Sequence, residues 1–144
     1  IFPSLDNFTD FIFVNDRKIK EKAEEYVKSL KTKTSSVYQP VRNLSGGNQQ
    51  KVVIAKWLIK NSKILIFDEP TRGIDVGAKY EIYQLINELA ENGKSVIMVS
   101  GELPELIGVC DRICVMSGGR LAGEVSGESA TQEEIMALAA KYVK

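Results

Sequence analysis

The sequence predicts an α/β protein with a mainly parallel sheet, preceded along the chain by a helical segment. Two short apolar runs, at residues 63–67 and 95–99, have the pattern of buried parallel strands. A stretch with helical character follows each run, at residues 76–91 and at residues 102–109. Alternation of strand and helix along a chain is typical of parallel α/β sheets, and this gives the predicted class.

The N-terminal part of the chain is predicted to be mainly helical. Apolar residues recur at helical spacing over residues 16–31, with Lys and Glu filling the other face. Residues 1–15 show no clear period and are expected to be irregular or to form a short helix. After a polar connection, Ser45 can cap a further helix over residues 47–60.

The C-terminal part adds a strand pair and a last helix. Residues 112–116 and 120–125 flank a pair of glycines and predict a β-hairpin. Thr131, with Glu134 three residues later, forms a capping box that opens a helix reaching to about residue 143.

The composition fits a soluble globular protein and argues against nucleic acid as a partner. The chain has 144 residues, about one domain by size. Its 19 basic and 19 acidic residues cancel, whereas a nucleic-acid binder usually has a basic excess. No apolar run approaches the roughly 18 residues needed to cross a membrane. The absence of His removes the usual zinc sites and any histidine-based catalysis.

Two further features bear on processing and redox chemistry. The first residue is Ile1 rather than Met, which indicates a fragment or a trimmed chain. Cys110 and Cys114 leave two interpretations open. They are a disulfide or metal-binding pair, or they are two small buried hydrophobic residues in a reducing cytosol.

The loop-to-helix segment Leu44-Ser45-Gly46-Gly47-Asn48 carries the most specific signal in the chain. A helix N-terminus offers unpaired amides and a positive dipole end, and therefore suits an anion such as phosphate. Two glycines let the backbone approach a phosphate without a clash from Cβ. Ser-Gly-Gly alone also fits an ordinary capped turn, but the Leu before it and the Asn-Gln-Gln-Lys after it favour the phosphate site.

Two carboxylates follow the first predicted strand. Asp68 can hold Mg²⁺ through water, because Mg²⁺ keeps much of its hydration. Glu69 can take a proton from an attacking water molecule. A solvated acidic strand end is the alternative, which the four apolar residues before the acids and the Pro-Thr after them make less favourable. Asp75 can cap the helix over residues 76–91 and can also serve a contact between domains.

Together these segments resemble the signature and Walker B motifs of the nucleotide-binding domain of an ABC transporter, a P-loop NTPase fold. The runs at residues 43–58, 68–79 and 100–106 narrow the resemblance. They look like the C-terminal cassette of the duplicated ATP-binding subunit of bacterial monosaccharide importers, the group serving ribose, galactose and xylose. The resemblance implies a helical, signature-bearing subdomain over residues 1–60 and the C-terminal part of the ATPase core over residues 61–144.

The resemblance also implies roles for individual residues. In this family the signature of one cassette closes on the γ-phosphate of ATP held by the opposite cassette. Asp68 matches the Mg²⁺ ligand, Glu69 the catalytic base and Asp75 the D-loop. Gly101 falls where most ABC ATPases carry the switch histidine. The signature residues implied to bind nucleotide are Ser45, Gly46, Gly47, Asn48 (where most ABC proteins have Gln) and Gln49.

Two departures from the family pattern shape the functional expectation. The Gly-x-x-x-x-Gly-Lys-Ser/Thr phosphate loop does not occur in the sequence, and its strand is expected to be missing between residues 95–99 and 112–116. Gly101 cannot hydrogen-bond a γ-phosphate through a side chain. We therefore expect the local ATP site to be degenerate, and the chain alone to lack useful ATPase activity and tight binding of ATP or Mg²⁺.

The resemblance implies an ATPase, an ATP-driven monosaccharide translocase, on the cytoplasmic face of the bacterial inner membrane. Its implied partners are the N-terminal cassette of the same subunit, a transmembrane permease and, indirectly, an extracytoplasmic sugar-binding protein. One alternative is a non-transport ABC ATPase of translation or DNA repair, which the neutral charge and the importer-like residues 73–79 disfavour. Another is a regulatory half-cassette without hydrolysis, which Gly101 favours and Glu69 disfavours.

Overall fold

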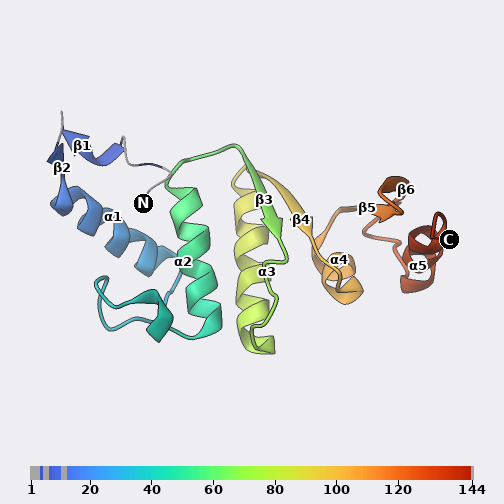
Figure 1. Ribbon diagram of the computed structural model, residues 1–144, viewed down its shortest axis with the longest axis horizontal. Helices are drawn as coiled ribbons and strands as arrows, with labels where there is room; N and C mark the ends of the chain where they lie inside the picture. The colour runs from blue at the N-terminus through green and yellow to red at the C-terminus, as the bar shows by residue number, and fades with distance from the viewer. Residues whose placement is uncertain (1–3, 5–6, 11–12, 144) are drawn as a thin grey trace. The chain divides into compact units, whose positions relative to one another are not determined.

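The computed structural model describes residues 4, 7–10 and 13–143 (Figure 1). The chain is divided into two compact units. The first contains residues 1–65 and 71–96, and the second contains residues 66–70 and 97–144.

The first unit begins with a short hairpin and continues as helices. Strands β1 (Thr9–Asp10) and β2 (Phe13–Val14) pair antiparallel, Thr9 opposite Val14 and Asp10 opposite Phe13. The expectation of irregular or helical structure over residues 1–15 is therefore wrong at these four residues. Strands of two residues are too short to show a period in the sequence.

Helix α1 (Asp16–Ser29) confirms the first predicted helix. Asn15 precedes it, and its side-chain oxygen accepts a hydrogen bond from the Lys18 amide at 3.0 Å. The helix ends two residues before the predicted position, and Lys31 then takes the left-handed backbone conformation with φ of 50°. The short 3₁₀ helix η2 (Val41–Asn43) leads into the next helix.

Helices α2 (Gly46–Leu58) and α3 (Val76–Glu91) pack against each other. The buried residues of α2 are Gly47, Lys51 and Ile54, which recur at helical spacing. A Cβ atom on Gly47 would overlap the Cβ of Ala78 on α3, so the two helices approach closely because Gly47 has no side chain. The buried residues of α3 are Ile82, Leu85 and Ile86.

Strands β3 (Ile64–Asp68) and β4 (Ser95–Val99) form a parallel pair. The Ser95 amide donates to the Lys63 carbonyl and the Glu69 amide to the Val99 carbonyl, each at 2.9 Å. The prediction of strands buried throughout is wrong. Residues of β3 alternate between exposed and buried, and no residue of β4 is fully buried. Alternate side chains of a strand point to opposite faces, and the exposed residues are Ile64 and Ile66 in β3 and Ile97 and Val99 in β4.

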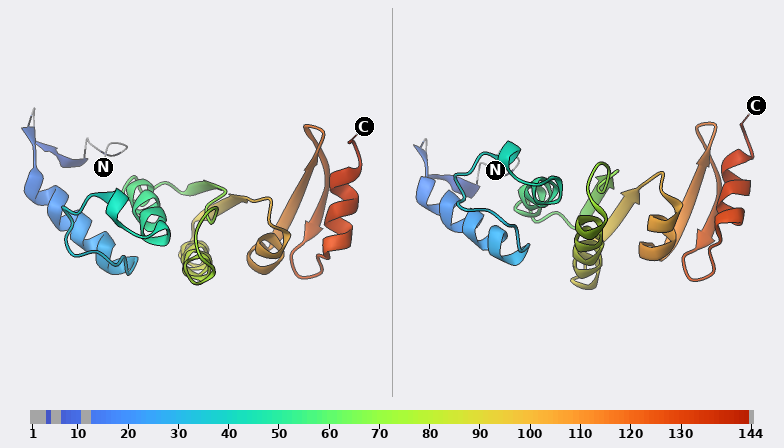
Figure 2. Two further views of the ribbon diagram at one scale, coloured as in Figure 1. Left: turned by 60° about the horizontal axis from the view of Figure 1, so that its bottom comes forward. Right: turned by 90° about the horizontal axis from the view of Figure 1, so that it is seen from below.

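The second unit also contains α4 (Leu103–Val109), an antiparallel hairpin and a last helix. Strands β5 (Arg112–Ser117) and β6 (Arg120–Ser126) confirm the predicted hairpin, and α5 (Gln132–Ala140) packs beside it (Figure 2). Thr131 caps α5 by accepting from the Glu134 amide at 3.2 Å. The buried residues Ile113, Val115 and Ile135 form the core of this part.

The two cysteines are free thiols and do not form a disulfide. Cys114 is exposed, so its interpretation as a buried hydrophobic residue is wrong. Cys110 is partly buried. Burial is the main cause that raises the pKa of its thiol, and the negative charge of Asp111 is the smaller one. Among residues 4, 7–10 and 13–143 there is no group of three metal-ligating side chains. Within the same residues, no helix combines the length and the apolar character needed to cross a membrane.

The close approach of α2 and α3 predicts opposite effects for two glycine substitutions. Gly47→Ala should lower the free energy of unfolding by about 1–3 kcal/mol, because the new methyl group overlaps Ala78. Gly77→Ala, at the exposed start of α3, places its Cβ at an ordinary 3.4 Å from Asp75 Oδ1. It should raise stability by up to about 1 kcal/mol. Urea unfolding followed by the fluorescence of Trp57, the single tryptophan, measures both. Equal effects of the two variants would contradict the packing role of Gly47.

Candidate functional site

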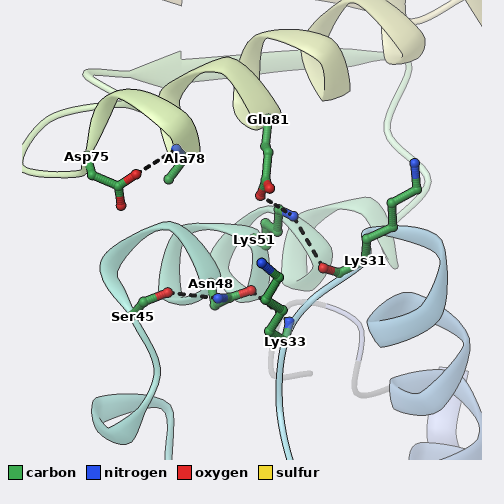
Figure 3. Close-up of polar contacts among 8 residues, drawn as sticks. All are labelled: Lys31, Lys33, Ser45, Asn48, Lys51, Asp75, Ala78 and Glu81. Carbon is green, nitrogen blue, oxygen red and sulfur yellow. Dashed lines mark hydrogen bonds and ion pairs between the residues drawn. The ribbon is translucent and has the colours of Figure 1, made fainter.

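The signature loop, as residues 44–49 are called here, comprises the turn before α2 and the first residues of that helix. Figure 3 shows the hydrogen bond between two of its side chains, Asn48 and Ser45. Ser45 stands at the N-cap position of α2 with an extended backbone. Its side chain, however, makes no capping hydrogen bond to the described backbone of α2, which corrects the expectation of a serine cap. Ser45 Oγ instead accepts from Asn48 Nδ2 at 2.7 Å. The hydroxyl therefore does not occupy the amides of the first turn.

Asn48 and Gln49 both bind within the protein. Asn48 Oδ1 accepts from the backbone amide of Lys33 at 2.8 Å, which ties the signature loop to the segment after α1. Gln49 Nε2 donates to the carbonyl of Leu44 at 2.8 Å, across the base of the loop. Both bonds restrain the loop from within the protein, and restrained donors favour the binding of an anion.

The two glycines of the signature pack against the start of α3. A Cβ on Gly46 would lie 3.1 Å from Ile74 Cγ2, tighter than most contacts in proteins. Gly47 meets Ala78, as described above. Asp75, between these contacts, caps α3 by accepting from the Ala78 amide at 2.9 Å, which confirms its predicted capping role. The structure therefore brings the signature and Asp75 together in the first unit.

An ion pair beside the signature was not predicted. Lys51 is only 5% exposed, and its Nζ lies 2.9 Å from Glu81 Oε2 on α3 and 3.4 Å from the Lys31 carbonyl (Figure 3). The hydrogen bond from Lys51, together with its charge, lowers the pKa of the Glu81 carboxyl. A lysine on the buried stripe of a helix, between Gly47 and Ile54, is the sequence signal that could have indicated this pair.

The two carboxylates that resemble a Walker B motif lie at the C-terminal end of β3, in the second unit. Asp68 is exposed, and Glu69 is half-buried. Glu69 takes the left-handed backbone conformation with φ of 48°, which is uncommon for a residue other than glycine. Such strain is concentrated at functional sites. An exposed carboxylate at a strand end fits Mg²⁺, which keeps several of its water ligands.

Gly101 meets Glu69 through its backbone. The Gly101 amide donates to Glu69 Oε1 at 3.2 Å, which orients the carboxylate. Ser100 restrains the backbone beside Gly101. Its hydroxyl accepts from the Glu102 amide at 3.0 Å and donates to Oε2 of the buried Glu105 at 2.8 Å. Asp68, Glu69 and Gly101 thus all belong to the second unit. A carboxylate at the end of β3 can hold a cation through water, and the amide of Gly101, after β4, can position Glu69 as a base.

Comparison with known proteins shows which proteins the chain is similar to. The family model described as ABC transporter matches residues 1–72. The chain is 54% identical over 144 residues to the galactose/methyl galactoside import ATP-binding protein of Clostridium perfringens, strain 13, covering 99% of the chain and 28% of that protein. It is 56% identical over 134 residues to the xylose import ATP-binding protein of Thermoanaerobacter pseudethanolicus, covering 93% of the chain and 26% of that protein. The chain therefore spans little more than a quarter of these relatives.

Solved structures agree on the fold. A nucleotide-free ATP-binding cassette from an ABC transporter superposes with a TM-score of 0.70 at 27% identity, over 83% of this chain and 46% of that one. A second ATP-binding cassette, MJ1267, gives a TM-score of 0.74 at 23% identity, over 96% of this chain and 55% of that one. The described structure thus has a partial ABC ATPase fold, and with the match of the family model over half its length the chain belongs to the ABC transporter family.

Proposed function

We propose that this chain is part of the ATP-binding and ATP-hydrolysing subunit that powers monosaccharide import across a bacterial inner membrane. The observation that carries the proposal is the signature loop, in which Ser45 Oγ accepts from Asn48 and does not cap the amides of the first turn of α2. The relatives named as galactose and xylose import ATP-binding proteins support the substrate class. We retain the division into a signature-bearing subdomain over residues 1–60 and a core over residues 61–144 as part of this proposal.

The signature serves an ATP molecule held by a partner cassette. Ser45, Gly46 and Gly47, with Asn48 and Gln49 behind them, complete that site. The partner is the N-terminal cassette of the same subunit. Asp75, which lies against the signature in the first unit, communicates across the pair of cassettes.

Asp68, Glu69 and Gly101 belong to the chain's own ATP site. Asp68 holds Mg²⁺ through water, and Glu69 accepts a proton from the water that attacks the γ-phosphate in line. The Gly101 amide orients Glu69 but is already engaged by it, and glycine has no side chain to offer a γ-phosphate. This site therefore turns over slowly, and the two sites of the pair are unequal.

The remaining partners follow from the same proposal. The subunit binds a transmembrane permease at the inner face of the membrane and acts indirectly with an extracytoplasmic sugar-binding protein. A regulatory half-cassette without hydrolysis is the second candidate, favoured by glycine at position 101. The two candidates differ in whether Glu69 contributes to turnover.

Substitutions of Ser45 and Glu69 in the complete subunit test which site hydrolyses ATP. Ser45→Arg should lower ATPase activity roughly a hundredfold or more, because it removes the hydroxyl and fills the phosphate position. Glu69→Gln should lower activity less than about tenfold, because it affects only the slow site. Ser29→Arg, at the exposed end of α1, is the control for added charge. A greater loss in Glu69→Gln than in Ser45→Arg would show that the active site is misassigned.

Restoring a side chain at position 101 tests the cause of the slow turnover. A Cβ on Gly101 would lie at an ordinary 3.6 Å from Glu69 Oε1, so the backbone accepts a larger residue. In a Ser45→Arg background, Gly101→His should raise the residual ATPase rate about tenfold or more. Gly101→Ala, the matched control, adds only the methyl group and should not raise it. An unchanged rate in Gly101→His would mean that position 101 does not limit this site.

The chain alone should not hydrolyse ATP at a useful rate, because it has no phosphate loop to hold the β- and γ-phosphates. Phosphate release by the purified 144-residue chain, compared with its Glu69→Gln variant, measures this. Magnesium-dependent release that Glu69→Gln abolishes would refute the expectation.

A further inference from the structure

The side-chain amide of Asn48 has a defined orientation. The Lys33 backbone N–H can only donate, so the atom of Asn48 that faces it at 2.8 Å must be the oxygen Oδ1. The nitrogen Nδ2 then faces Ser45 Oγ at 2.7 Å, and it can only donate to that oxygen (Figure 3). The direction of both hydrogen bonds is therefore fixed by the backbone of Lys33.

This direction determines what the Ser45 hydroxyl can do. A serine hydroxyl has one proton to donate and two lone pairs that accept. Asn48 occupies one lone pair, so the proton cannot point toward Nδ2. Ser45 is an exposed residue. The hydroxyl proton is therefore available to a ligand at the N-terminus of α2.

We propose that Asn48 is a positioning residue, which orients the Ser45 hydroxyl so that its proton is directed at a phosphate oxygen of the bound nucleotide. The inference rests on the proposed function, in which Ser45 contacts ATP held by the partner cassette. It gives Asn48 an indirect role, in which Oδ1 accepts from the Lys33 amide and one N–H of Nδ2 donates to Ser45 Oγ. The segment after α1 then sets the hydrogen-bonding direction of the signature, across 15 residues of sequence.

The Asn48→Asp variant in the complete subunit tests this inference. A carboxylate keeps the size of the side chain and can still accept from the Lys33 amide. Its second oxygen accepts rather than donates, so the Ser45 hydroxyl donates its proton to this carboxylate. The phosphate then no longer receives that hydrogen bond. The kcat for ATP hydrolysis should fall roughly tenfold to a hundredfold, as expected for a displaced catalytic contact. Gln50→Glu adds the same charge two residues further along α2 and measures the effect of charge alone.

A double-mutant cycle with Ser45→Ala separates positioning from other effects. If Asn48 acts through Ser45, Asn48→Asp in the Ser45→Ala background should lower kcat no further than Gln50→Glu does. An undiminished further loss in that background, or a normal kcat in Asn48→Asp itself, would overturn the inference. Asn48→Ala, which removes both hydrogen bonds, is carried through the same cycle, and thermal unfolding establishes that each variant is folded.

The cycle also distinguishes this inference from the function on which it rests. A clear loss in Ser45→Arg and Ser45→Ala together with additive effects of Asn48→Asp refutes only the positioning role. Normal turnover in both Ser45 variants refutes the contact of the signature with nucleotide, and the positioning role with it.

Discussion

The packing of α2 against α3 is the contact on which the arrangement of the first unit depends. Gly47 lets the two helices approach until its backbone meets Ala78. At that separation the buried ammonium of Lys51 reaches Glu81 and the Lys31 carbonyl. A buried charge without a partner is strongly unfavourable, so this pair opposes any separation of the helices. The same approach sets Gly46 against Ile74, and thereby places the signature beside the residues around Asp75.

Under the proposed function, the signature glycines both bind phosphate and allow close packing, and these two roles do not compete. A phosphate site needs a backbone free of side chains on its outer surface, and close helix packing needs the same on the inner surface. Gly47 is buried, so its lack of a side chain serves the packing, whereas Gly46 is exposed and also touches Ile74. The packing of α2 against α3 holds the signature loop in place, because the amides of the first turn keep their direction only while α2 is fixed.

The sequence predicted the features that are determined by neighbouring residues. It did not predict those that depend on residues far away along the chain. The helices, the hairpin of β5 and β6, and the caps at Asp75 and Thr131 follow from periodicity and nearby polar residues. The role of Ser45 was mispredicted, because the cap competes with Asn48, whose orientation is set 15 residues upstream. The exposure of Ile64 and Ile66 could not be predicted either, since an apolar run does not reveal what covers each face.

The hydrogen bond between Gly101 and Glu69 shows that a glycine at position 101 does not remove every interaction of this position. The carboxylate is still oriented, because a backbone amide donates to it at 3.2 Å. That amide cannot titrate, and it cannot turn toward another acceptor without moving the backbone. The hydroxyl of Ser100, bonded to Glu102 and Glu105, holds that backbone in turn. Under the proposed function, position 101 thus still helps to place the base, and it lacks a side-chain donor for charge that develops on a phosphate.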